Sequence, residues 1–498
     1  MCQKGLLTHP FLITMKRGVL YLLFGFLTLG LICVSCGDDD DEVVTEETQS
    51  EESDEEQSDD STSGDEDSEE DSDEGSGDEE SVDPGEGNDD GLGNQDELGE
   101  GNGDMGNGGG SSSESIGSVS ETGYSQSSGT YSVTEETYTS TNSDENAVQV
   151  TGGTFNMTDC TVLKSSGDTS DSDGSSFYGI NSAVYCSGSS SVVNISGGTV
   201  TTSASGANGV FAYNYGTINI SDVTINTSSN LSRGIHATDG GIINASNLTI
   251  TTARTNCSVI ATDRGGGTVT VNGGTYTTTG DDSAVVYSTG TITVSDITGS
   301  SSSGEMCVIE GSNSITLNDC VLSSGSSSRG LMILQSGSGD SEGYDGYITV
   351  TGGSLTMSSS SAPLLEVPTA INATLTLKDV SLSVPSGVLM YVNYNTQWST
   401  YGGYGSLVMT TGSSCTYIGD VKADSCSSAE VEVGSGVTWS GSINNGNTAK
   451  SASVVVEGVW NLTGNSYVDT LTLGSGGTVN TNGYTLQYGS LSGGGTIN

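Results

Sequence analysis

Three observations predict that most of this chain folds as an all-β parallel β-helix, a three-sided β-solenoid. Each repeat contains three short alternations of apolar and polar residues, which is the pattern of a β-strand. A repeat of about 25 residues leaves only short turns between three strands. Stacked coils place equivalent residues ~4.8 Å apart, so the in-facing column must hold compatible side chains. That column is aliphatic and recurs at steps of 25, 25, 26, 23 and 23 residues: Val193, Ile218, Ile243, Val269, Ile292 and Ile315.

Residues 1–36 have the pattern of an export signal. A positive segment, Met15-Lys16-Arg17, precedes the apolar run 18–32, which is too short to span a bilayer comfortably. The translation start is Met1 or Met15. The segment from Cys33 to Cys36 resembles a bacterial lipoprotein signal, except that Cys33 stands where such signals prefer Leu. The resemblance implies that Cys36 carries the lipid and tethers the chain to a membrane.

Residues 37–115 form a Ser/Gly/Asp/Glu tract with few apolar residues. Of the 63 acidic residues in the chain, 33 lie between positions 37 and 104, where there is no Lys or Arg. Such a segment cannot bury enough apolar surface to fold, so we predict a disordered acidic linker. The run Asp38–Asp41 directly after Cys36 is similar to the surface-export signal of Bacteroidota lipoproteins, which implies an outer-membrane lipoprotein facing out of the cell. A net charge of −52 also argues against nucleic acid as a partner.

Residues 116–428 are predicted to be the β-helix. Cys160 and Cys320 occupy in-facing positions of the repeat, so we expect buried thiols rather than disulfides. Cys186 is placed in the column of Ala212, Ala237 and Ala261, and Cys307 in that of Ile235. Whether Cys415 and Cys426 pair is left open.

An acidic loop interrupts the first coils. Asp168, Asp171 and Asp173 are spaced so that carboxylate oxygens at alternate positions could converge on one calcium ion. A polar loop without a metal is the alternative. No other cofactor is expected.

Two further inserts fall at one corner of the repeat, because the anchor spacing grows to 33 between Ile315 and Ile348 and to 32 between Leu375 and Leu407. Aromatic side chains with acidic neighbours in long loops on a rigid scaffold are typical of recognition sites, and aromatic rings also stack on sugars. The alternative is that these rings fold back over the coil edges. The candidate ligand-binding residues are Asp340, Tyr344, Asp345, Tyr347, Tyr394, Trp398, Tyr401 and Tyr404.

Residues 429–498 change register and resemble the C-terminal coils of autotransporter and adhesin-like passengers. The likeness rests on Trp460, the turn Gly464-Asn465-Ser466, the strand Leu471-Thr472-Leu473 and the closing segment from Leu491 to Thr496. It implies a stable cap for folding.

The coils as a whole look like the pectin-lyase-type β-helix, which implies a right-handed coil. That fold serves polysaccharide lyases, pectinases and adhesins, so it does not decide function. The best catalytic arrangement would stack Asp239 over Asp263, with Arg233, His236 and Arg264 nearby. Asp is also an ordinary corner residue, and we expect His236 to face outward without a catalytic partner.

The preferred interpretation is a surface lipoprotein that displays a non-catalytic, adhesin-like β-helix, with glycans or surface proteins of a host or neighbouring cell as partners. No catalytic residue is assigned. The first alternative is a carbohydrate-active enzyme of the polysaccharide lyase or pectinase type. The second is a purely structural surface protein.

Overall fold

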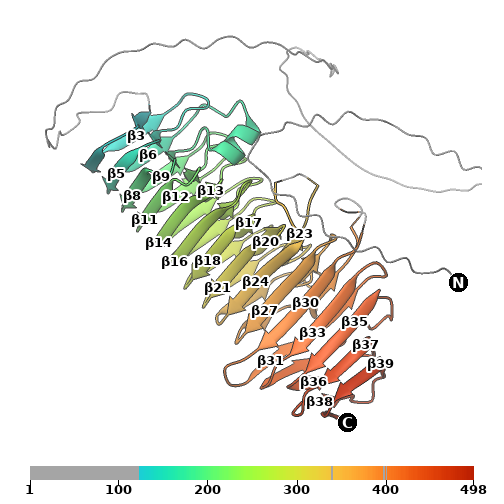
Figure 1. Cartoon of the computed structure of the whole chain (residues 1–498). Helices are drawn as coiled ribbons and strands as arrows, with labels where there is room; N and C mark the ends of the chain where they lie inside the picture. The colour runs from blue at the N-terminus through green and yellow to red at the C-terminus, as the bar shows by residue number, and fades with distance from the viewer. Residues whose placement is uncertain (1–122, 338–339, 396–398, 400) are drawn as a thin grey trace, which may run out of the picture. The chain divides into compact units, whose positions relative to one another are not determined.

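The structure, a computed structural model, describes residues 123–337, 340–395, 399 and 401–498. These residues form a stack of coils in which every named strand pairing is parallel, and strands of successive coils lie side by side along one axis (Figure 1). The all-β parallel β-helix predicted from the repeat is therefore confirmed. The predicted leader and acidic linker, residues 1–115, lie outside the described residues.

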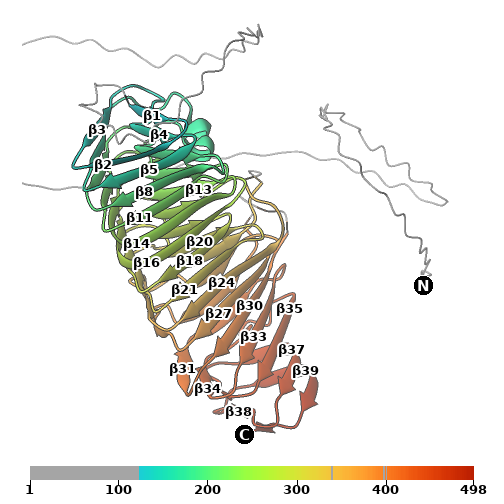
Figure 2. The ribbon, with the colours of Figure 1, turned by 60° about the vertical axis from the view of Figure 1, so that its left-hand side comes forward.

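Each coil contributes first to sheet A, which has 12 strands and forms one side of the stack (Figure 2). Its strands are β1 (Tyr124–Gln126), β4 (Val148–Val150), β7 (Val184–Ser187), β10 (Val210–Tyr213), β13 (Ile235–Thr238), β15 (Ile260–Thr262), β17 (Val286–Ser288), β20 (Cys307–Glu310), β23 (Leu331–Leu334), β26 (Leu365–Val367), β29 (Val388–Val392) and β32 (Asp420–Ala423).

The second strand of each coil lies on the first side of the 23-stranded sheet B. These strands are β2 (Thr130–Thr134), β5 (Gly153–Thr158), β8 (Ser191–Ser196), β11 (Thr217–Ser221), β14 (Gly241–Thr252), β16 (Gly267–Thr278), β18 (Thr291–Ser295), β21 (Ser314–Asn318), β24 (Asp345–Thr351), β27 (Asn372–Lys378), β30 (Tyr404–Thr410), β33 (Ser428–Val433), β35 (Ser451–Val456), β37 (Ser466–Leu473) and β39 (Leu486–Gly493).

The third strand lies on the second side of sheet B, to which the long strands β14 and β16 also contribute. The other members are β3 (Thr137–Ser140), β6 (Thr161–Lys164), β9 (Thr199–Thr202), β12 (Thr224–Thr227), β19 (Thr298–Ser301), β22 (Val321–Ser324), β25 (Ser354–Met357) and β28 (Ser381–Ser383). From there on, sheet C takes the third place in each coil, with β31 (Cys415–Ile418), β34 (Val437–Ser440), β36 (Val459–Asn461), β38 (Thr478–Asn480) and β40 (Thr496–Ile497).

The aliphatic column lies in the core, as predicted. Its members pair in register from coil to coil, and none of them is exposed: Val193, Ile218, Ile243, Val269, Ile292, Ile315, Ile348, Leu375 and Leu407. The parallel ladder carries these side chains into direct contact one above another. Burial of this column, together with the other buried side chains of the core, stabilises the stack.

A second column of equivalent residues lies at the corner where the chain turns from the first side of sheet B to the second. In each coil from β2 to β28, the corner residue has a positive φ, which Gly, Asn and Asp tolerate best. The corner residues are Glu135, Asp159, Gly197, Asp222, Asn247, Gly273, Asp296, Asp319, Gly352 and Asp379. The turn pairs that separate the alternations in the sequence therefore mark this corner.

The cysteine placements are confirmed with one correction. Cys160, Cys186, Cys307 and Cys320 are buried in the core with free thiols, and Cys415 and Cys426 are also unpaired. Cys186 lies in register with Ala212, then Ala237, and the next member is Thr262 rather than Ala261. The reason is that strands β13 and β15 pair with a step of 25 residues, one more than the distance between the two alanines.

The arrangement of strands within each coil changes near Ser428. Sheet A ends at β32, and only an isolated bridge between Val421 and Ile443 continues it. The following coils are filled by two stacked indoles, Trp439 and Trp460, whose ring centroids lie 5.0 Å apart. Both side chains are fully buried, and each indole N–H donates to a backbone carbonyl oxygen, of Gly419 and Gly441 respectively.

The column gives the first testable prediction. Ile243→Ala should lower the free energy of unfolding by about 2–5 kcal/mol, because it removes fully buried methyl groups from a packed core. Its neighbour Ile242 faces outward and is only half-buried, so Ile242→Ala should have a clearly smaller effect. Urea unfolding of residues 105–498 measures both. Equal losses for the two variants would contradict the assignment of the in-facing side.

Candidate functional site

The two predicted inserts lie at the same corner, between sheet A and the first side of sheet B. One joins β23 to β24 and the other joins β29 to β30, two coils further on. Asp345 and Tyr404 are the register neighbours of Asn372, which lies on β27 between them. The Asn372 side-chain amide donates to the Asp345 carboxylate over 2.9 Å. The structure thus brings the bases of the two inserts together.

The rest of the predicted ligand site does not converge. Asp340 turns toward β15 and β16, where its carboxylate accepts from the Arg264 guanidinium at 2.6 Å. The backbone N–H of Tyr394 donates to Asp424, 2.6 Å away. The Tyr404 hydroxyl donates to the Glu430 carboxylate.

The remaining predicted tyrosines lie on the surface, where Tyr344, Tyr347 and Tyr401 are 60%, 48% and 73% exposed. Trp398 lies outside the described residues. These three rings are exposed to solvent, and no ring contact among the described residues joins any two of them.

The predicted calcium-binding aspartates have separate roles. Asp168 accepts from the backbone N–H of Ser205, and Asp171 accepts from that of Gly174 at the start of the short π-helix η1 (Gly174–Tyr178). All three carboxylates are exposed. Among the described residues, no group of three or more His, Cys, Asp or Glu side chains is arranged to hold a metal ion.

The loop that contains these aspartates covers part of sheet A. The Thr238 hydroxyl donates to the carbonyl oxygen of Phe177, and the Phe177 ring lies 3.8 Å below the Arg264 guanidinium. Ser176 accepts from Arg233 at 3.1 Å. The loop and η1 therefore close over the outer face of β13 and β15, a contact between segments far apart in the sequence.

The carboxylate pair that the enzyme alternative requires is not formed. Asp239 does not stack over Asp263, because its backbone N–H bonds to the carbonyl of Arg264, one residue further along. Asp263 is instead buried in an ion pair with Arg233 at 3.1 Å. His236 faces outward from the coil, as predicted, but it lies against the Phe211 ring and is fully buried.

Burial also shifts the pKa values of His236 and Asp263. It lowers the pKa of His236 well below its usual value, with Arg233 acting in the same direction, so the imidazole is neutral. Burial raises the pKa of Asp263 to about 6, although Arg233 opposes the shift. Neither ring nitrogen of His236 has a hydrogen-bond partner among the described side chains and backbone groups. These groups are closed off from substrate by the covering loop.

The Asp263 shift gives the second prediction. Because its folded-state pKa is raised, Asp263 contributes stability below its ordinary pKa of 3.8, and this contribution is lost as the pH rises through about 6. The stability of the native protein relative to Asp263→Asn should therefore fall by about 2 kcal/mol between pH 4 and pH 7. Urea unfolding at several pH values measures this difference. Parallel pH profiles for the two proteins would contradict it.

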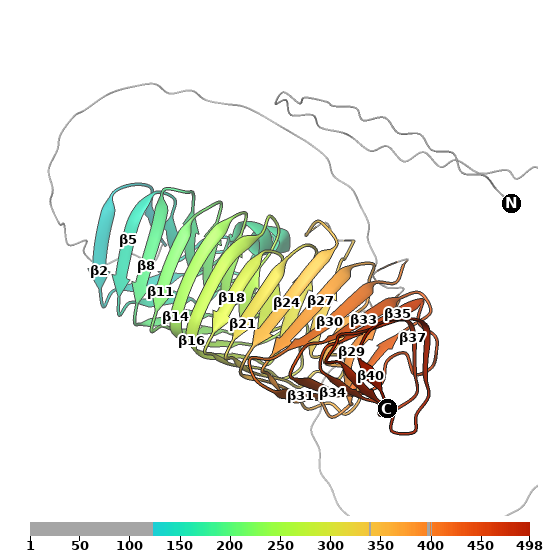
Figure 3. The same ribbon diagram turned by 60° about the horizontal axis from the view of Figure 1, so that its bottom comes forward.

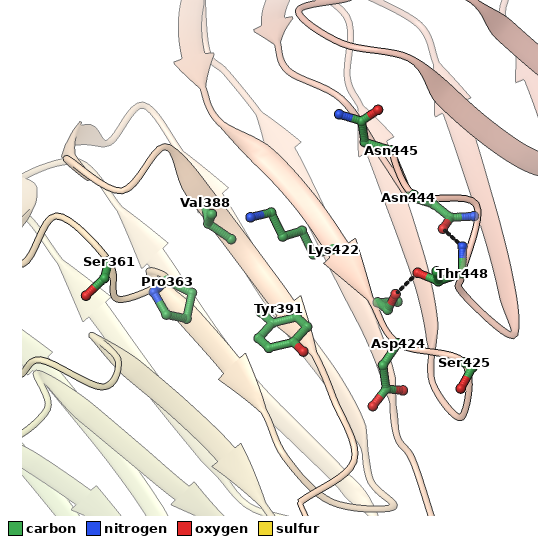
Figure 4. A pocket seen from close by; sticks show the side chains of 12 residues that line it. Ser361, Pro363, Val388, Tyr391, Lys422, Asp424, Ser425, Asn444, Asn445 and Thr448 are labelled. Atoms are coloured by element: carbon green, nitrogen blue, oxygen red, sulfur yellow. Dashed lines mark hydrogen bonds between the residues drawn. The ribbon is translucent and has the colours of Figure 1, made fainter. Parts of the chain in front are cut away.

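A further hollow lies elsewhere, where sheet A ends. We call it the sheet A cleft; it encloses about 680 Å³. Figure 4 shows Tyr391 on β29, with Lys422 and Asp424 on the next segment of the same face. Its lining is formed by Ser361, Pro363, Val388, Tyr391, Lys422, Ala423, Asp424, Ser425, Asn444, Asn445, Gly446 and Thr448.

The cleft residues are positioned by register and turns. Tyr391 pairs with Glu366 on one side and Lys422 on the other, so one out-facing column carries an acid, a ring and an amine. Asp424 is held by two backbone N–H groups, from Tyr394 and Cys426. Asn444 accepts from Thr448 and shapes the opposite wall.

The cleft combines the apolar surface of Pro363, Val388, Tyr391 and Ala423 with seven residues that have polar side chains, and small-molecule sites likewise place polar groups around apolar surface. Burial raises the pKa of the Tyr391 hydroxyl, with Asp424 and Glu366 adding to the effect, so the phenol stays protonated. Lys422 is exposed and forms none of the four salt bridges found among the described residues. The arrangement offers a ring face for stacking, a cation and a hydroxyl donor.

Two shallower hollows lie on other parts of the stack. A trough of about 560 Å³ runs along the corner beside Arg264 and Asp340 and is floored by Gly265, Gly266 and Gly267. A groove of about 290 Å³ follows β5, β8, β11 and β14, over a ladder of hydrogen-bonded asparagines that includes Asn194 and Asn219. Neither of them has an aromatic wall.

Comparison with known proteins finds no match: no family model, no curated protein and no solved structure is similar to this chain. In the part of the chain that the structure describes, no helix has the length and apolarity to cross a membrane.

Proposed function

We propose that this chain is a cell-surface lipoprotein whose β-helix binds glycans without chemical turnover, in the manner of an adhesin. The observation that carries the proposal is the sheet A cleft, in which Tyr391 provides an aromatic face beside Lys422 and Asp424. Sugar rings present C–H bonds that pack on aromatic faces, and their hydroxyl groups need hydrogen-bond partners at the rim.

Rigidity supports binding as the task of the cleft. Tyr391 and Lys422 lie on the paired strands β29 and β32 of sheet A, and Asp424 is fixed by two backbone hydrogen bonds. A preorganised site loses little conformational freedom when it binds a ligand. The same rigidity suits display at a surface.

Binding is favoured over catalysis because of the cluster around Asp263. Its histidine and carboxylate are buried under the loop that contains η1, and the Asp239–Asp263 pair is not formed. General acid–base catalysis needs a group within hydrogen-bond reach of the substrate. The lyase-like alternative therefore loses the residues on which it depended.

The cleft gives the third prediction. Tyr391→Ala should weaken glycan binding by residues 105–498 at least tenfold, because it removes the stacking surface of the site. Lys422→Gln should weaken the binding of only those glycans that carry a carboxylate or sulfate. Glycan-array screening followed by calorimetric titration of the best ligand measures both effects.

Tyr131→Ala is the matched control, since Tyr131 is 40% exposed on β2, far from the cleft in the chain. It should leave binding unchanged. The same protein should release no reducing ends or unsaturated products from uronate polymers. Equal binding by the Tyr391 variant, or product formation, would contradict the proposal.

The membrane anchor gives the fourth prediction. Cys36→Ser should release the protein from the membrane fraction and stop its processing, because the thiol of Cys36 is the proposed acceptor of the lipid. Cys33→Ser is the control and should leave the anchor intact. Fractionation of expressing cells, with metabolic labelling by a palmitate analogue, measures the result. A Cys36 variant that remains in the membrane and carries label would overturn this part of the proposal.

A further inference from the structure

One member of a buried polar column differs from all the others. On the second side of sheet B, the last in-facing position of each coil from β3 to β22 carries a buried polar side chain. Every member but one has a hydroxyl group, and the exception is a fully buried lysine on β6. Lysine is among the residues that proteins bury least often. The members, in register from coil to coil, are Ser140, Lys164, Thr202, Thr227, Thr252, Thr278, Ser301 and Ser324.

The Lys164 amine has neutral hydrogen-bond partners. It donates to the backbone carbonyl oxygen of Asn142 and, over 3.3 Å, to the hydroxyl of Ser140. None of the ion pairs found in the described part of the chain involves Lys164. Burial lowers the pKa of the amine, although nearby carboxylates, that of Glu145 first, oppose the shift. A larger share of the amine is therefore neutral, and the neutral amine is the nucleophilic form.

A chain of hydrogen bonds joins this amine to the side-chain amide of Asn142. The Ser140 hydroxyl, which accepts from Lys164, donates to the Glu145 carboxylate at 2.6 Å. The same carboxylate oxygen, Oε2, accepts from Nδ2 of Asn142 at 3.1 Å. Nδ2 is the nitrogen that must leave when another amine replaces it on the carboxamide carbon. The cluster thus holds a nucleophile, a path for its proton, an acid–base group and a leaving nitrogen.

The register of the first two coils creates this arrangement. Lys164 ends β6 and Ser140 ends β3, and the two residues are register neighbours. Figure 1 shows β3 beside β6, and Figure 3 shows β2 beside β5 in the same two coils. Ser140 is also fully buried, whereas Asn142 is exposed in the turn that follows β3. Water is therefore kept from the amine, while ammonia released from the carboxamide can reach solvent.

We propose that Lys164 and Asn142 become joined by an amide bond that cross-links the first two coils. The lone pair of Nζ attacks Cγ of Asn142 and forms the new C–N bond, and a proton of Nζ passes through the Ser140 hydroxyl to the Glu145 carboxylate. The Cγ–Nδ2 bond then breaks. Glu145 returns the proton to Nδ2, which leaves as ammonia, so the step needs no oxidant or co-reactant. The bond closes a ring over residues 142–164 and restricts the unfolded chain.

The test is the intact mass of residues 105–498, which form a compact unit of their own. The expected mass is lower by one ammonia molecule than the mass calculated from the sequence. Tryptic digestion should show no cleavage after Lys164, and tandem mass spectrometry should find the chain branched between positions 142 and 164. A folded protein with the full calculated mass would overturn the proposal, since Lys164 would then be only a hydrogen-bond partner of the turn.

Substitutions separate the cross-link from a second way of losing ammonia. Asn142 can also close a succinimide ring with the backbone nitrogen of Ser143, and that reaction does not use the lysine. Lys164→Met should therefore restore the full mass if the cross-link is the product. Loss of ammonia that persists in this variant would contradict the proposal.

Glu145→Gln tests the proton path without changing the buried lysine. It should also restore the full mass, because a carboxamide cannot take the proton from the amine and return it to Nδ2. Lys378→Met is the matched control, since Lys378 is exposed on β27, and it should keep the loss of ammonia. Circular dichroism checks that each variant is folded. A cross-link that forms fully in the Glu145 variant would overturn the role assigned to this carboxylate.

Discussion

The constraint on which the rest of this structure depends is the register between successive coils. Each strand exchanges backbone hydrogen bonds with the coil before and the coil after, and a slip by one residue would turn its aliphatic side chains to solvent. The aliphatic column through Ile218 and Ile243 therefore holds its place from β8 to β30. Long insertions leave the stack at corners, as the loop with η1 and the two later inserts do, whereas β29 takes up a single extra residue as a bulge at Leu389.

The same constraint explains how much of the fold could be predicted from sequence. A column of equivalent residues repeats in every coil, so the in-facing side of sheet B and the positions of the inserts could be identified before the structure. The sequence prediction fails where the spacing of similar residues in two repeats differs from the pairing register of their strands. The Thr-Asp pairs ending at Asp239 and Asp263 are 24 residues apart, but β13 and β15 pair with a step of 25, from Ile235 to Ile260. The spacing therefore predicts that the two carboxylates lie one above the other. In the structure they are offset by one residue along the strands.

The candidate site could be predicted only in part, because it depends on features that do not repeat. The bases of the inserts meet at Asn372, as their spacing implies, and Tyr344, Tyr347 and Tyr401 are exposed to solvent. The burial of His236 depends on a loop more than fifty residues earlier in the chain, as the Phe177–Thr238 contact shows. The sheet A cleft exists because two kinds of coil meet after β32, which brings Tyr391 and Asn444 to one hollow. No periodic pattern contains that information.

Hydrogen–deuterium exchange with and without a bound glycan tests the central claim, that the sheet A cleft is the binding site, most directly. The account predicts that ligand slows amide exchange in the segments 388–394 and 420–426, which contain Tyr391, Lys422 and Asp424. Exchange around Arg264 and Asp340, at the corner trough, should not change. Protection confined to that trough or to the exposed insert around Tyr344, with none at the cleft, would contradict the account.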